Sequence, residues 1–289
     1  MTAADGRFAM TSTDVDYEAE YNNRARVPEH PEIFARWTAA AQSFREEMAS
    51  RGRAELGLAY GETPRQFFDL FLAERGPEKL AVFIHGGYWR SLEPRMFSHM
   101  ARGMLAHGIS VAVAGYDLCP QVQVAGIVDE IRRACAYLWR RFERRLLVYG
   151  HSAGGHLAAC MLATDWKKLG MPADAVPAAC AVSGVFDLTP LIGISMNADL
   201  RLDLLEARRV SPLFWPAPRG RTLDVIGGAE ESPEFLRQSR EIAETWAAAG
   251  ASTRYEEAPG NHFTVLDPLA DPASAMTKRL AALIEQTLR

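Results

Sequence analysis

Short apolar runs alternate with helical patterns through most of this 289-residue chain, and this alternation restricts the possible folds more than any other feature. Strands that alternate with helices form βαβ units and a mostly parallel sheet. Runs that are apolar throughout indicate strands buried on both faces. The expected strands cover 66–73, 79–87, 109–117, 145–150, 179–184, 222–228 and 252–258, most of them apolar runs, and helical spacing recurs over 122–142, 233–249 and 273–288. We therefore expect an α/β fold with helices flanking a central sheet.

Two segments lie outside this alternation. Residues 1–16 are expected to be flexible, and residues 17–53 form a helical extension because apolar residues recur there at helical spacing. Residues 184–220 form a long irregular insertion between two expected strands, where substrate pockets are commonly built. No linker rich in proline, glycine and serine divides the chain, so residues 1–289 are expected to form one domain.

The composition excludes several classes of protein. A net charge of −4 gives no reason to expect a nucleic-acid partner. No apolar run approaches the roughly 20 residues of a membrane span, and the N-terminus lacks the pattern of a signal peptide. The four cysteines are widely spaced, without a C-x-x-C pair, which favours buried free thiols. We expect a cytoplasmic protein without a membrane partner, and the sequence leaves a homodimer open.

The sequence G-x-S-x-G at 150–154 stands where an expected strand becomes an expected helix. This setting is typical of the nucleophile elbow, in which a strained turn presents the serine and small neighbours prevent clashes. A serine hydroxyl becomes reactive only when a base and oxyanion donors surround it. Ser152 is therefore the expected nucleophile.

Donors for an oxyanion are expected from two places. The first is the N–H of Ala153 at the start of the helix after the serine. The second is the sequence HGGYWR at 85–90, directly after an apolar strand, where glycines let the main chain turn its N–H groups inward. We expect the main-chain N–H groups of Gly87, Tyr88 and Ala153 to form the oxyanion hole.

The base must be one of seven histidines. His85 belongs to the oxyanion turn, where it is expected to brace the loop, and the side chain of His151 must point away from its neighbour Ser152. His262, in PGNHFTVLDP, follows the last expected strand and lies on a loop that can reach over the carboxyl edge of the sheet. By order along the chain and by position on a loop, His262 is the expected base.

The acid of such a triad lies between the serine and the histidine along the chain. Glu230 and Glu231 precede Ser232, the expected N-cap of the next helix, and either one can accept the imidazole N–H. Asp224 and Asp267 are alternatives, the first inside a strand and the second only five residues after His262. The histidines lack metal-ligand spacing and there is no nucleotide-binding glycine motif, so neither a metal nor a cofactor is expected.

These motifs resemble those of the kynurenine formamidase (arylformamidase) family of α/β-hydrolases. The resemblance runs from about Tyr17 to the C-terminus and is carried by EYNNRARVPEH, HGGYW, GHSAGGHL, SPEFLRQSR and NHF. The H-G-G-x-W element is the most specific, because related carboxylesterases more often carry H-G-G-G. The family places the triad acid directly before the SPEF-like helix start, which implies Glu231, although many members have aspartate there. The resemblance implies an α/β-hydrolase fold and hydrolysis of N-formyl-L-kynurenine to kynurenine and formate, a step of tryptophan catabolism.

The residues themselves indicate only serine-dependent acyl hydrolysis of a small molecule, and an aryl formamide or ester as substrate is what the resemblance implies. Tyr88 and Trp89 beside the oxyanion turn, with Phe186 and Phe214 in the insertion, are the expected aryl pocket. A carboxylesterase or another small amidase would use the same machinery. A ligand-binding receptor that has lost catalysis is the alternative from another class, but such proteins usually lack a triad residue.

Overall fold

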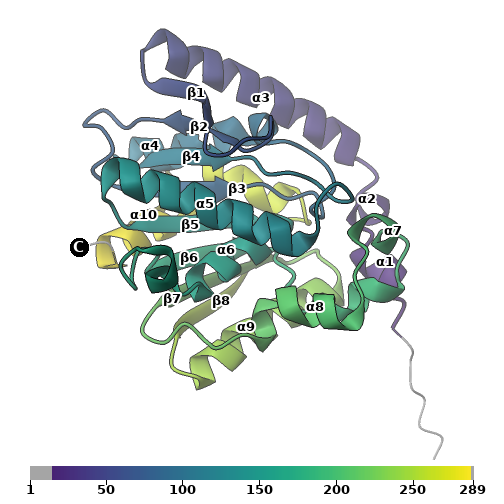
Figure 1. Ribbon diagram of the computed structural model, residues 1–289. Helices are drawn as coiled ribbons and strands as arrows, with labels where there is room; N and C mark the ends of the chain where they lie inside the picture. Colours follow the sequence, from purple (N-terminus) through teal and green to yellow (C-terminus); the bar gives the residue numbers. More distant parts are fainter. Residues whose placement is uncertain (1–14, 288–289) are drawn as a thin grey trace, which may run out of the picture.

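The structure is a computed structural model that describes residues 15–287. One eight-stranded sheet runs through the molecule and carries helices on both faces (Figure 1). The expected flexibility of residues 1–16 falls almost entirely outside the described residues.

The sheet has the strand order β1-β2-β4-β3-β5-β6-β7-β8. Strands β3 to β8 are parallel, whereas β2 runs antiparallel to both β1 and β4. The bounds are β1 Ala54–Ala59, β2 Phe67–Phe71, β3 Leu80–Ile84, β4 Ser110–Ala114, β5 Leu146–His151, β6 Ala178–Val182, β7 Thr222–Gly228 and β8 Ser252–Ala258. All seven predicted strands are confirmed. The sequence prediction missed β1, because this edge strand is half exposed and has no continuous apolar run.

The helices also follow the sequence pattern. The predicted extension at 17–53 consists of three helices, and the start of α9 is confirmed by the Ser232 hydroxyl, which accepts a hydrogen bond from the Phe235 N–H. The α-helices are α1 Tyr17–Tyr21, α2 Asn23–Arg26, α3 His30–Ser50, α4 Arg102–Ala106, α5 Val124–Phe142, α6 Ala153–Ala163, α7 Asn197–Leu200, α8 Leu204–Val210, α9 Pro233–Ala248 and α10 Ala275–Thr287. The 3-10 helices are η1 Pro94–Ala101, η2 Trp166–Leu169, η3 Thr189–Gly193, η4 Pro212–Phe214 and η5 Thr264–Ala270.

Alternate side chains of each central strand enter two different cores. In β3, Val82 and Ile84 pack with helices α5 and α6, whereas Ala81 and Phe83 pack on the other side with α3, α4 and α10. This follows from the two-residue period of a strand, which sends successive side chains to opposite faces. Burial on both faces explains why these strands read as continuous apolar runs. The four cysteines are free and buried, as the sequence predicted.

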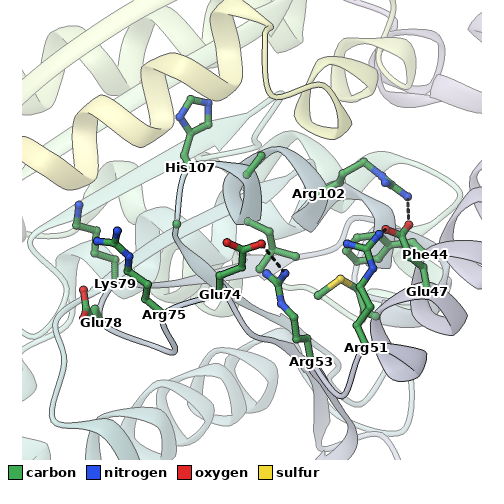
Figure 2. A pocket seen from close by; sticks show the side chains of 14 residues that line it. Phe44, Glu47, Arg51, Arg53, Glu74, Arg75, Glu78, Lys79, Arg102 and His107 are labelled. Carbon is green, nitrogen blue, oxygen red and sulfur yellow. Dashed lines mark hydrogen bonds and ion pairs between the residues drawn. The ribbon is translucent and has the colours of Figure 1, made fainter.

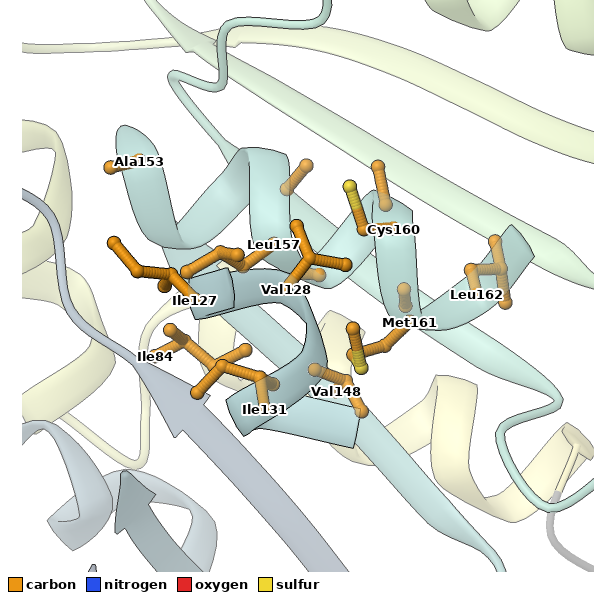
Figure 3. Close-up of a cluster of buried hydrophobic side chains, with 14 of the residues drawn as sticks. Ile84, Ile127, Val128, Ile131, Val148, Ala153, Leu157, Cys160, Met161 and Leu162 are labelled. Atoms are coloured by element: carbon orange, nitrogen blue, oxygen red, sulfur yellow. The ribbon is translucent and has the colours of Figure 1, made fainter. Parts of the chain in front are cut away.

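Helices α5 and α6 pack together against the centre of the sheet. Figure 3 shows Ile127 and Ile131 of α5 packed with Leu157 of α6 over Ile84 and Val148, all of them buried. This packing fixes the start of α6, and with it the residue before that helix, relative to β3 and β5.

The chain changes direction across the sheet at β3. From β3 it passes to β4 on one side and then returns to β5 on the other side. Ligand sites of open α/β sheets lie at the carboxyl ends of the strands beside such a switch point. The turns that follow β3 and β5 contain HGGYWR and G-x-S-x-G, so the fold places both motifs at the edge where a site is expected.

Candidate active site

Ser152 occupies the turn between β5 and α6 in a backbone conformation that non-glycine residues rarely adopt, with φ 55° and ψ −118°. The two glycines of the motif allow this turn. A Cβ atom at Gly150 would lie 2.3 Å from the carbonyl oxygen of Gly154, and one at Gly154 would lie 2.0 Å from that of Ile84. Only glycine fits at both positions, so the motif is required by the close approach of this turn to β3.

The turn after β3 lies directly against the serine. A Cβ atom at Gly86 would be 3.0 Å from Cβ of Ser152. Gly87 has φ 116° and Tyr88 has φ 50°, so the main chain reverses here. Within residues 15–287, the N–H groups of Gly87, Tyr88 and Ala153 donate no hydrogen bond. Three unpaired donors beside a strained serine are what an oxyanion hole requires.

His85 braces this turn from inside the protein. Its Nδ1 lies 2.7 Å from the Gly86 carbonyl oxygen, to which it donates, and its ring stacks on Tyr116 with the centroids 4.3 Å apart. Burial lowers the pKa of His85 to about 3, so the imidazole is neutral in the folded protein. The role as a brace that the sequence suggested matches these contacts.

His262 and Glu231 meet over the carboxyl edge of the sheet. The imidazole Nδ1 of His262 lies 3.2 Å from Oε2 of Glu231, and the two side chains are 5% and 0% exposed. The other carboxylate oxygen accepts hydrogen bonds from the Gly228 N–H at 2.8 Å and from the Ser183 hydroxyl. Glu231 is thereby held in one orientation, with Oε2 facing the histidine.

The other three carboxylates considered from the sequence have different partners. Glu230 is exposed. Asp224 is paired with Nε of Arg279 at 2.5 Å. Asp267 accepts from Trp37 Nε1 at 2.9 Å and is paired with Arg36 at 2.7 Å, so it fastens α3 to the loop after β8. Of the four carboxylates, only Glu231 contacts His262.

His151 fixes the loop that carries His262. Its Nε2 lies 2.7 Å from the His262 carbonyl oxygen, and the two ring centroids are 4.7 Å apart. Burial, together with the nearby His262, lowers the pKa of His151 well below its ordinary value, so His151 is a neutral donor. His151 lines the same cavity as Ser152, and its bond to the loop could not be predicted from the sequence.

Ser152 and His262 line the same small cavity, of about 80 Å³. Most of the wall comes from the N-terminal helices, the oxyanion turn and the loop after β8. The lining residues are Tyr21, Asn22, Asn23, Arg24, Phe34, Trp37, Gly87, Tyr88, Arg90, Ser91, Leu92, Phe97, His151, Ser152, Met196, His262 and Phe263. The N-terminal extension therefore covers the site, a role that its helical pattern alone did not reveal.

The predicted aryl pocket needs correction. Trp89 and Phe186 are fully buried and do not line the cavity, because Trp89 packs against His156 on α6 and Phe186 packs over Gly184. Phe214 lies outside the cavity and is 44% exposed. The insertion at 184–220 contributes Met196 to the lining.

Aromatic side chains still surround the serine, but they come from other segments. Phe34 and Trp37 of α3, Phe97 of η1 and Phe263 of the loop after β8 line the cavity with Tyr88. The rings of Phe34 and Phe263 meet edge to face at 5.1 Å. This wall suits a planar aryl group, because aromatic rings favour such contacts.

A larger cavity of about 550 Å³ lies at the opposite edge of the sheet, where β3 and β4 begin (Figure 2). Its charged side chains largely neutralise one another. Glu47 is paired with Arg51 at 3.0 Å and with Arg102 at 2.9 Å, and Arg53 lies 3.7 Å from Glu74. In the part of the chain that the structure describes, no serine lines this cavity, so the chemistry expected from the sequence belongs to the smaller one.

The chain resembles hydrolases of known sequence and structure. The BD-FAE family model matches residues 68–198. Kynurenine formamidase of Danio rerio is 28% identical over 85% of this chain and 87% of that protein, and the Drosophila melanogaster enzyme is 29% identical over 92% and 95%. A solved candidate thioesterase from Silicibacter sp. TM1040 is 35% identical, covers 92% of this chain and 98% of its own, and has a TM-score of 0.80.

The chain is thus similar to kynurenine formamidases over most of its length and is an α/β-hydrolase. It is therefore an enzyme, and the α/β-hydrolase fold expected from the sequence is confirmed. Among residues 15–287, no helix has the length and apolar character needed to cross a membrane.

The neutral state of His85 predicts an acid-sensitive fold. The pKa of His85 is about 3 in the folded protein and near 6.5 in the unfolded chain. The unfolded state thus binds more protons, and the stabilisation from this group, fully present above pH 6.5, is lost as the pH falls toward 3. We expect His85→Gln to reduce the decline in unfolding free energy between pH 7 and 4.5, measured by urea titration. The exposed His107→Gln is the control, and an unchanged slope in His85→Gln would contradict this account.

The contact between His262 and Glu231 predicts unequal effects of two adjacent substitutions. Glu231→Gln removes the charge that stabilises a protonated His262, so we expect kcat to fall by roughly 10³–10⁴-fold. Glu230→Gln is the matched control and should cost less than about tenfold, because this side chain is exposed. Steady-state hydrolysis of an aryl formamide measures both. The reverse ranking would assign the acid to Glu230.

Proposed function

We propose that this enzyme hydrolyses N-formyl-L-kynurenine to kynurenine and formate, with Ser152 as nucleophile, His262 as base and Glu231 as acid. The contact of 3.2 Å between Glu231 and His262 carries the proposal, because His262 lines the same cavity as Ser152. Similarity to kynurenine formamidases over most of the chain supports the choice of substrate.

In the first half of the reaction the serine takes the formyl group. His262 Nε2 accepts the hydroxyl proton while Ser152 Oγ bonds to the formyl carbon, and Glu231 accepts a hydrogen bond from Nδ1–H of the resulting imidazolium. The N–H groups of Gly87, Tyr88 and Ala153 bind the oxygen that becomes negative. The carbon–nitrogen bond then breaks, and the aryl amine leaves with the proton from His262.

In the second half water releases formate. His262 removes a proton from the water as its oxygen bonds to the carbon of the formyl ester, and the same three N–H groups hold the second oxyanion. The ester bond breaks, Ser152 regains its proton from His262, and formic acid leaves and loses its proton to solvent water to give formate. Each half-reaction uses the same base and the same donors, so no other group is required.

The small space beside Ser152 favours a formyl group over larger acyl groups. The oxyanion turn approaches the serine so closely that a Cβ at Gly86 would lie 3.0 Å from Cβ of Ser152, and the cavity measures about 80 Å³. The formyl group carries a hydrogen atom where an acetyl group carries a methyl group. The aromatic wall of Phe34, Trp37 and Phe263 supplies contacts for an aryl amine as leaving group.

A comparison of three substrates tests this function against a carboxylesterase. We expect kcat/KM for N-formyl-L-kynurenine to exceed that for p-nitrophenyl acetate by about tenfold or more, with N-formylanthranilate between them. Ser152→Ala provides the blank for spontaneous hydrolysis. Turnover of the ester without turnover of either formamide would show that the enzyme is a carboxylesterase.

The cytoplasmic location predicted from the sequence remains part of this proposal. A homodimer stays open in the same way, and sedimentation of the purified protein decides it. The substrate is a small molecule in either case.

A further inference from the structure

Two arginines, Arg24 and Arg90, line the active-site cavity. Among residues 15–287, no aspartate or glutamate lines it. Uncompensated positive charge beside a cavity favours an anionic ligand. A formamide is neutral, so the catalytic residues alone do not account for this charge.

The two arginines differ in their partners. The guanidinium of Arg90 is paired with the carboxylate of Asp199. Arg24 has no carboxylate partner within residues 15–287. Its Nη2 lies 3.5 Å from Ser91 Oγ, and its Cζ lies 5.9 Å from the ring centre of Phe34. Arg24 is thus held beside the cavity with its charge available.

The backbone around Arg24 is fixed to the oxyanion turn. The Asn22 side chain caps helix α2 by accepting from the Ala25 N–H at 3.2 Å. The hydroxyl of Tyr88 donates to the Tyr21 carbonyl oxygen at 2.6 Å, and burial raises the pKa of Tyr88 well above its ordinary value, so this donor keeps its proton. The position of Arg24 is therefore set relative to the reacting groups.

The exposure of the lining residues distinguishes the inner end of the cavity from its mouth. Ser152 is 2% exposed, whereas Arg24 is exposed and stands at the mouth. A cavity of about 80 Å³ is smaller than the roughly 300–1,000 Å³ of typical ligand pockets. A substrate whose acyl group reaches Ser152 therefore places its opposite end at the mouth.

We propose that Arg24 binds the carboxylate of an amino-acid side chain on the aryl formamide substrate. This inference rests on the proposed function, because it names the group recognised at the end remote from the formamide. In N-formyl-L-kynurenine the carboxylate is at that end. The guanidinium offers a planar pair of N–H donors that match a carboxylate, and such charge-assisted hydrogen bonds are among the strong ones in proteins.

The first test compares a substrate that has the carboxylate with one that lacks it. N-formyl-L-kynurenine and N-formyl-2-aminoacetophenone share the arene, the ketone and the formamide. We expect Arg24→Gln to lower the ratio of their kcat/KM values by about 10–100-fold, mainly through KM of the first substrate. Arg24→Lys should recover part of the ratio, because it keeps the charge.

Arg26→Gln is the matched control. Arg26 lies on the same short helix α2 and is also exposed, but it does not line the cavity. Its substitution should leave the ratio within twofold of the original enzyme. An equal loss on both substrates in Arg24→Gln, or no loss on either, would overturn the proposal for Arg24.

A second test does not depend on formamidase activity. The carboxylate 4-oxo-4-phenylbutanoate and its methyl ester are compared as competitive inhibitors of p-nitrophenyl acetate hydrolysis. The original enzyme should bind the carboxylate about tenfold more tightly than the ester, and Arg24→Gln should lose this preference. A preference that survives in Arg24→Gln overturns the role of Arg24. A preference that requires Arg24, in an enzyme that does not cleave N-formyl-L-kynurenine, supports that role and rejects only the proposed substrate.

Discussion

The close approach of the turn after β5 to the end of β3 is the constraint on which the rest of the site depends. Gly154 lies so near the Ile84 carbonyl that no Cβ fits, and Ser152 is left with a positive φ. Such strain persists only where the surroundings fix it, and here the packing of α5 and α6 on the sheet does so. The same approach brings the oxyanion turn against the serine.

Around this turn, histidines with different environments take different roles. His85 and His151 are buried, their pKa values are lowered, and each donates to a main-chain carbonyl oxygen that positions a loop. His262 instead contacts the carboxylate of Glu231, which in the proposed mechanism stabilises the imidazolium formed when the serine loses its proton. The site thus combines two neutral braces with one histidine arranged for proton transfer. Glu231 is itself held by Ser183 and Gly228.

The parts that the sequence predicted well are those that local physical chemistry determines. Burial on both faces makes β3 and β5 continuous apolar runs, and the nucleophile elbow needs glycine at 150 and 154. The strands and the elbow could therefore both be predicted from the sequence. The aryl pocket was predicted wrongly, because a position beside the oxyanion turn does not determine where a side chain points. The side chain of Trp89 is buried in the core. The cover formed by Tyr21 and Arg24 depends on contacts across the chain that no local pattern contains. Ser183 could have been found by its position, because it follows β6 at the carboxyl edge of the sheet, where the site lies.

The central claim is that Ser152 is the attacking nucleophile. Labelling with a fluorophosphonate followed by peptide mass spectrometry tests it most directly, because the reagent forms a phosphorus–oxygen bond with an activated serine and releases fluoride. The account predicts one adduct per chain, on the peptide that contains Ser152, with loss of activity in proportion to labelling. An adduct on another serine that accompanies the loss of activity, or full activity in a completely labelled enzyme, would contradict it.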